Sequence, residues 1–150
     1  MKVGRTKAVI NHVDIAPTTL GLCGIPTPAS MVGHDYSAHC IHSDAPEYKG
    51  PPKTDKEPES AYLQQIPRKF HRHSVNKAWR GVVTRDGWKY VCTPGNDWLL
   101  FNTVEDSYEQ ANYVYDRSYQ EPKEYCHNLL ARWIEKTGDN FQLPDISLPQ

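Results

Sequence analysis

The chain has 150 residues, an apolar content of 38% and a formal charge of −1, from 17 Lys and Arg against 18 Asp and Glu. This length favours one domain, and the charge balance excludes a globally basic nucleic-acid-binding protein. No run of about 20 apolar residues occurs, so the sequence predicts no transmembrane helix and no membrane partner.

The N-terminal segment predicts a strand, a tight turn and a short helix. The N-terminus is basic, but no apolar stretch of signal-peptide length follows it. Residues 8–15 are rich in β-branched side chains, which predicts a buried strand. Pro17 favours a first helical turn, Asp14 can accept hydrogen bonds from free helix N–H groups, and Gly24 ends the helix.

The middle of the chain predicts a long loop and then a small antiparallel sheet. Residues 26–60 are rich in proline and mixed charge, which is typical of a loop. Four short segments rich in β-branched and aromatic residues follow. Asp-Gly and Pro-Gly turns between them predict a meander of three or four strands. These segments are residues 60–66, 79–84, 88–92 and 98–102.

The last predicted element is a helix from about residue 121 to residue 137. Its apolar side chains recur at helical spacing and form one stripe, and Gly138 is suited to the position after a helix end. The tail, residues 139–150, contains two prolines and is predicted to be a surface strap.

The near-zero charge conceals a dipolar distribution. Residues 68–89 contain seven Lys or Arg against one Asp, whereas residues 105–124 contain six acids against two bases. A cationic edge can steer an anionic substrate. The structural alternative is a solvated face paired with the acidic segment.

Other candidate sites have weaker support. The four cysteines are widely spaced, so we interpret them as free thiols, and Cys92 as a strand-end thiol without the cationic environment of a nucleophile. Three His and one Cys within residues 34–42 could bind zinc, but their spacing matches no standard finger, and a polar loop is the preferred interpretation. The zinc candidates are His34, His39, Cys40 and His42.

Five segments together resemble the sulfatase family, the formylglycine-dependent sulfate-ester hydrolases of the alkaline-phosphatase superfamily. Residues 9–26 (VINHVDIAPTTLGLCGIP) resemble a family signature, and residues 33–37 (GHDYS) resemble the "GxDLS" that follows it. Residues 79–91 resemble "WRAVRT…YKYI", and residues 99–112 resemble "LYDLxxDPxExxNL". The closing residues 130–139 also fit, so the resemblance covers most of the chain in the family's order.

The resemblance implies only the C-terminal portion of such an enzyme, with an α+β fold. Residues 1–59 would be the tail of the α/β catalytic domain plus a loop, and residues 60–150 a C-terminal antiparallel-sheet subdomain with a packed helix. The motif C-x-[PS]-x-R is absent, since the sequence after Cys92 lacks the Arg. Formylglycine and calcium would therefore belong to an upstream sulfatase catalytic domain, with no cofactor in this chain. We expect no activity from the chain alone, and we expect the apolar face of residues 8–24 to be under-covered in isolation.

The resemblance also implies a position at the lip of the substrate pocket. We therefore expect His71, Arg72, His73 and Arg80 to contact an anionic sulfated small molecule or glycan. Val83 stands where the family has Arg, which removes one candidate anion contact. The alternative is a stand-alone module that binds anions or sulfated glycans.

Overall fold

The computed structural model describes residues 7–39, 57–66 and 77–146. The chain divides into two compact units, Met1–Pro58 and Glu59–Gln150. The first unit contains short helices, and the second contains four strands and a long helix. The assignment of these units to two sulfatase domains stays a prediction.

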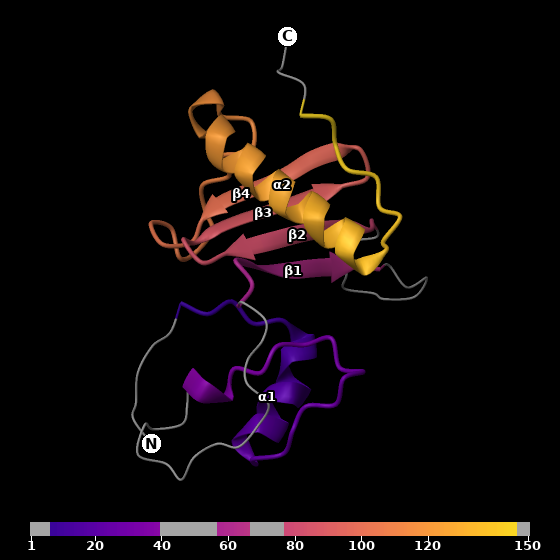
Figure 1. Cartoon of the computed structure of the whole chain (residues 1–150). Helices are drawn as coiled ribbons and strands as arrows, with labels where there is room; N and C mark the ends of the chain where they lie inside the picture. The colour runs from indigo at the N-terminus through magenta and orange to yellow at the C-terminus, as the bar shows by residue number, and fades with distance from the viewer. Residues whose placement is uncertain (1–6, 40–56, 67–76, 147–150) are drawn as a thin grey trace. The chain divides into compact units, whose positions relative to one another are not determined.

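The second unit is built on a four-stranded antiparallel sheet whose strand order follows the chain, β1-β2-β3-β4 (Figure 1). Its hairpins turn at Gly87 and Gly95, whose φ angles of 95° and 70° favour glycine. The predicted meander and the α+β fold class are confirmed. The strands are β1 (Ser60–Gln65), β2 (Trp79–Thr84), β3 (Trp88–Thr93) and β4 (Asn96–Asn102).

One face of this sheet forms the core with helix α2 (Gln120–Thr137), which lies across it (Figure 1). The strand register aligns one core side chain from each strand in a lateral row: Tyr62, Val82, Tyr90 and Leu100. Tyr62 is partly buried, and the other three are fully buried within the cluster that also contains Cys126, Leu129 and Leu130 of α2. Burial of this apolar stripe, rather than helix propensity alone, stabilises the helix.

The two ends of α2 show why the helix has these limits. The side chain of Asp116 accepts a hydrogen bond from the backbone N–H of Ser118 in the 3-10 turn Arg117–Tyr119, directly before the helix. At the other end Gly138 adopts a φ of 63°, and its N–H donates to the carbonyl of Glu135. The predicted helix is therefore confirmed, with one more residue at its start.

The segment after α2 packs against the sheet unit and is more than a surface strap. Phe141 and Leu143 are partly buried against the core cluster. The backbone N–H of Gly95, in the β3–β4 turn, donates to the carbonyl of Gln142 at 3.1 Å. His127 Nε2 lies 3.0 Å from the carbonyl oxygen of Pro144. The tail is thus tied to both the sheet and the helix as far as residue 146.

The strand predicted over residues 8–15 is wrong. A 3-10 turn occupies His12–Asp14, and helix α1 follows at Ile15–Leu22. The buried carboxylate of Asp14 explains the turn, since it accepts the N–H of Asn11 and the N–H of His34, both at 2.7 Å. These two bonds bend the backbone where an extended strand was expected. β-branched residues favour a strand only where a neighbouring strand can pair and pack with them.

The inner face of α1 is lined by small and polar groups. Thr18 Oγ1 accepts the N–H of Tyr36 at 3.1 Å, and the Tyr36 hydroxyl donates to the carbonyl of Val9 at 2.9 Å. A Cβ added at Gly21 would overlap the carboxylate of Asp35 and would lie 2.5 Å from Ser37 Oγ. The residues resembling the "GxDLS" motif therefore pack closely against α1, at a position that only glycine accommodates.

Large apolar side chains of the first unit lie in solvent. Val13, Ile15 and Leu22 are each more than half exposed. The expectation that the apolar face of residues 8–24 is under-covered in isolation stays a prediction, which hydrogen exchange would test. None of the described helices has both the length and the apolar character to cross a membrane. The exposed apolar residues are Ile10, Val13, Ile15, Leu22, Ile25, Met31 and Val32.

Candidate functional site

Of the four predicted substrate contacts, the structure describes Arg80. It lies on β2, and only 7% of it is exposed. His71, Arg72 and His73 lie outside the described residues. The candidate site is therefore built from Arg80 outward.

The guanidinium of Arg80 has protein partners on several sides. Its Nε lies 2.6 Å from Asp139 Oδ2, in an ion pair whose side chains are 9% and 13% exposed. The Arg80 carbon Cζ lies 4.9 Å from the centre of the Phe141 ring, a cation–π contact. The segment after α2 is thus attached to β2 through one arginine.

Arg80 also joins the two strands, β1 and β2, that flank the connection of residues 66–78, called the basic connection below. Its Nη1 donates to the carbonyl of Gln65 at 3.2 Å and to the carbonyl of Trp79 at 3.1 Å. Gln65 is the last residue of β1, and Trp79 is the first of β2. One side chain therefore fixes both ends of the connection that carries His71, Arg72 and His73 in the sequence. The expected contact between Arg80 and substrate stays a prediction.

Asp139 and Tyr62 complete this cluster. The Tyr62 hydroxyl donates to Asp139 Oδ2 at 2.9 Å. The hydrogen bond from Arg80 holds the pKa of Asp139 below its ordinary value, with the Tyr62 bond acting in the same direction. Burial is the largest cause, and the hydrogen bond to Asp139 the next, of a rise in the pKa of Tyr62 to about 12. These pKa shifts favour an Arg80–Asp139 ion pair beside a neutral Tyr62 phenol at neutral pH.

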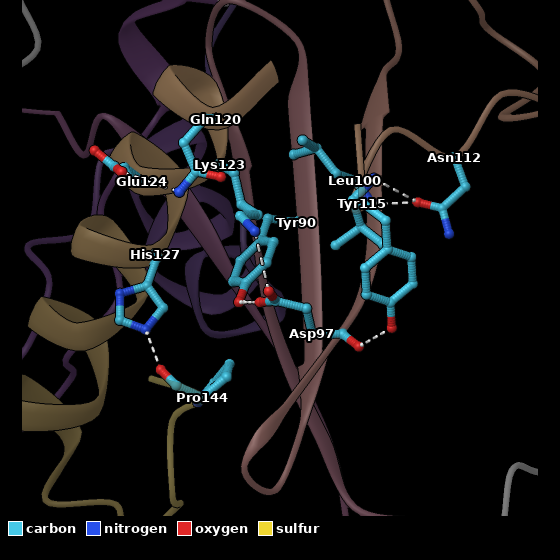
Figure 2. A network of polar contacts seen from close by, with 11 residues as sticks. Tyr90, Asp97, Leu100, Asn112, Tyr115, Gln120, Lys123, Glu124, His127 and Pro144 are labelled. Atoms are coloured by element: carbon cyan, nitrogen blue, oxygen red, sulfur yellow. Dashed lines mark hydrogen bonds and ion pairs between the residues drawn. The ribbon is translucent and has the colours of Figure 1, made fainter. Parts of the chain in front are cut away.

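A second polar network lies between the sheet and α2 (Figure 2). The Tyr90 hydroxyl donates to Asp97 Oδ1 at 2.5 Å, and Lys123 Nζ lies 3.2 Å from Asp97 Oδ2. Tyr115 donates to the backbone carbonyl of Asp97. The sequence analysis did not identify this network, because its bonded residues are up to 26 positions apart, as for Asp97 and Lys123, and share no local pattern. Burial raises the pKa of Tyr90, so the phenol stays protonated and joins β3 to β4.

The described thiols have the properties of core side chains. Cys92 and Cys126 are free and fully buried, and burial raises the pKa of each thiol to about 12. A reactive cysteine requires a populated thiolate, which these environments disfavour. Cys23 is also free, but it is exposed at the end of α1. The interpretation of Cys92 as an unreactive thiol is therefore supported.

The described residues contain no group of three or more His, Cys, Asp or Glu that could hold a metal ion. His34 and His39 lie in the described part of the chain. Their partners in the zinc alternative, Cys40 and His42, lie outside it. The polar-loop interpretation remains the preferred one for this segment.

Sequence comparison gives one significant relative. No protein-family model matches the chain. Over 141 residues, 94% of this chain, it is 26% identical to an ulvan-active sulfatase from Formosa agariphila. The resemblance to sulfatases is thereby confirmed. The sulfatase-like chain spans about a quarter (25%) of the length of that relative.

Solved structures show the same fold in larger proteins. A 2-O GAG sulfatase matches 91% of this chain with a TM-score of 0.70 at 20% identity, over 27% of its own length. A protein solved in complex with its substrate D-glucosamine-2-N,6-O-disulfate matches 85% of this chain with a TM-score of 0.64 at 22% identity, over 24% of its own length. In each case the sulfatase-like chain corresponds to about a quarter of a longer protein.

Proposed function

We propose that this chain is the C-terminal part of a sulfatase-like sulfate-ester hydrolase, supplying scaffold and a cationic rim to the substrate pocket. The observation that carries the proposal is the extent of the match, which covers 94% of this chain but 25% of the relative. The nucleophile would then come from an upstream catalytic domain. The proposal places calcium and formylglycine there too, because the motif C-x-[PS]-x-R does not occur in this sequence.

The rim role is assigned to the basic connection between β1 and β2. This connection contains four bases, Arg68, Lys69, Arg72 and Lys77, and no acid, and it forms the first part of the basic segment 68–89, whose net charge is +6. Sulfate esters are anions, and one neighbouring structure holds a disulfated sugar as its substrate. Arg80 would act as the positioning residue of this connection, since it bonds the last residue of β1 and the first of β2. His71, Arg72 and His73 would then face the sulfated ligand.

The test is a chimera in which this chain replaces the matched region of the ulvan-active sulfatase. We expect the free chain to show no aryl-sulfate turnover and the chimera to show it. In the chimera, Arg72→Gln should raise KM several-fold, while Arg132→Gln, an exposed arginine on α2 outside the basic segment, should leave KM unchanged. A folded chimera without turnover would contradict the proposal. Turnover by the free chain that survives replacement of all four cysteines by serine would also contradict it.

A stand-alone binding module is the alternative, because the second unit has a core of its own. This alternative predicts salt-dependent binding of a sulfated polysaccharide by the free chain, lost on Arg72→Gln and Arg80→Gln. An absence of binding at low salt would eliminate it. Its readout is independent of turnover, so the two candidate functions are distinguished.

A further inference from the structure

Helix α2 fixes the backbone that carries the Asp139 carboxylate. The N–H of Asp139 donates to the carbonyl of Ile134 at 3.0 Å, and the N–H of Gly138 donates to the carbonyl of Glu135 at 3.1 Å. With Gly138 in the left-handed region, these bonds form a Schellman motif, which closes the helix. The C-terminal end of α2 lies beside β1, whose Tyr62 hydroxyl donates to the same carboxylate (Figure 1). Asp139 is therefore held by both the helix and the sheet.

Arg80 carries this position to two strand ends. Its Nε donates to Asp139 at 2.6 Å, and its Nη1 donates to the carbonyls of Gln65 and Trp79. These two residues pair across the strands, so they form the end of the β1–β2 ladder at which the basic connection starts and finishes. The guanidinium is planar, with its donors in fixed directions. A change in the place of the carboxylate therefore changes the Nη1 bonds as well.

A second aspartate of the sheet unit has similar partners but a different place. Asp97 accepts the Tyr90 hydroxyl and lies 3.2 Å from Lys123 Nζ, so it too joins a carboxylate to one tyrosine and one cation. Its side chain is 19% exposed, against 13% for Asp139. Asp97 lies on β4, which the strand order separates from β1 and β2 by β3. The chain thus contains a matched pair of aspartates, one beside the basic connection and one away from it.

We infer that Asp139 is a positioning residue for the sulfated ligand, because through Arg80 it holds the two strand ends that carry the basic connection. Ligand binding at that connection is part of the proposed function, on which this inference rests. Binding groups that are held in their bound geometry before the ligand arrives give higher affinity, since less ordering accompanies binding. The segment after α2 therefore contributes to ligand affinity through Arg80 rather than through a contact with the ligand.

The chimera described above tests the effect on ligand affinity. Asp139→Asn should raise KM for the aryl sulfate about fivefold and change kcat by less than about twofold, because the nucleophile is assigned to the upstream domain. Asp139→Glu, which keeps a carboxylate, should have a KM closer to that of wild type. Asp97→Asn removes an equivalent charge away from the basic connection and should leave KM unchanged. Equal rises in KM for Asp139→Asn and Asp97→Asn, or an effect confined to kcat, would overturn the inference.

A milder pair of variants covers the case in which Asp139→Asn does not fold. Tyr62→Phe removes one hydrogen bond of Asp139 and keeps its ion pair with Arg80. Tyr90→Phe removes the corresponding bond of Asp97. We expect Tyr62→Phe to raise KM about twofold and Tyr90→Phe to leave it unchanged. If only this pair folds, equal KM values for the two variants would overturn the inference.

Hydrogen exchange in the free chain tests the positioning step without turnover. Asp139→Asn should speed exchange about tenfold for the amides at the end of the β1–β2 ladder next to the basic connection, residues 64–66 and 79–81, because the arginine that bonds this end is then held less firmly. The opposite end of the same ladder, where Ser60 pairs with Thr84, is the internal control and should change less. Equal acceleration at both ends would show only a loss of stability and would overturn the inference.

The two experiments separate this inference from the proposed function. A folded chimera without turnover would contradict the proposed function, while exchange that increases at one end only would still support Asp139 as the group that positions the strand ends. Turnover with a KM that Asp139→Asn leaves unchanged would support the proposed function and overturn the inference.

Discussion

Replacing Asp139 by asparagine tests whether the Arg80 ion pair holds the sheet unit together. The substitution preserves the shape of the side chain but removes the charge that faces the Arg80 guanidinium at 2.6 Å. Arg80 is only 7% exposed, so its charge would remain in the protein without a counter-ion. Tyr62 would also lose its carboxylate acceptor.

The burial of the pair sets the expected magnitude. Removing one partner of a buried ion pair costs about 3–5 kcal/mol, and we expect about 3 kcal/mol here because both side chains retain a little exposure. The matched control is Glu109→Gln, which breaks the pair with Lys89 at 2.8 Å, where the side chains are 26% and 33% exposed. We expect this more exposed pair to contribute below about 1 kcal/mol.

The assay is urea unfolding followed by tryptophan fluorescence, which reports on the second unit because all four tryptophans lie there. The pKa of Asp139 is lower in the folded state than in the unfolded chain, so the stabilisation is present above the unfolded pKa and is lost as pH falls through the folded pKa. The difference in the free energy of unfolding between wild type and Asp139→Asn should therefore be constant near neutrality and become smaller below about pH 4. The reasoning would be refuted if Asp139→Asn lowered the free energy of unfolding no more than Glu109→Gln does. It would also be refuted if the difference from wild type stayed the same in acid.

Three further predictions use other parts of the structure. Leu130→Ala should lower the free energy of unfolding by about 2–5 kcal/mol in the same assay, because this side chain is fully buried; a loss below about 1 kcal/mol would contradict its core role. Gly33→Ala should speed hydrogen exchange in α1 without altering tryptophan-detected unfolding, since a Cβ there would overlap the carbonyl of Val13; unchanged exchange would count against this packing. At pH 8, iodoacetamide should modify Cys23 and spare Cys92, whose thiol has a pKa of about 12; modification of Cys92 in the folded protein would show that it is more accessible than the structure indicates.

The sheet and α2 could be predicted because their signals are local. Alternation of apolar residues, the Asp-Gly and Pro-Gly turns and one apolar stripe each span a few residues, and the structure places the strands and the helix close to the predicted limits. The prediction of a strand over residues 8–15 was wrong for a physical reason. The carboxylate of Asp14 bonds the N–H of His34, a contact twenty residues away that the local pattern does not contain.

The candidate site shows the same limit. Arg80 was selected for its charge within a basic segment, but its partner is Asp139, 59 residues further along the chain. Local charge patterning cannot show such a pair, because the fold brings the two groups together. Sequence alone therefore identified the charged side chain but not its ion-pair partner. The family resemblance, in contrast, depended on the order of several motifs over most of the chain and agrees with the relative found by comparison.

The chain-order topology of the sheet also has a kinetic consequence. Each strand pairs only with its neighbours in sequence, and two of the three pairings close through tight turns. Such short-range contacts form early and quickly, because little loop-closure entropy opposes them. We therefore expect the sheet to form on a timescale of about milliseconds, early in the folding of the second unit.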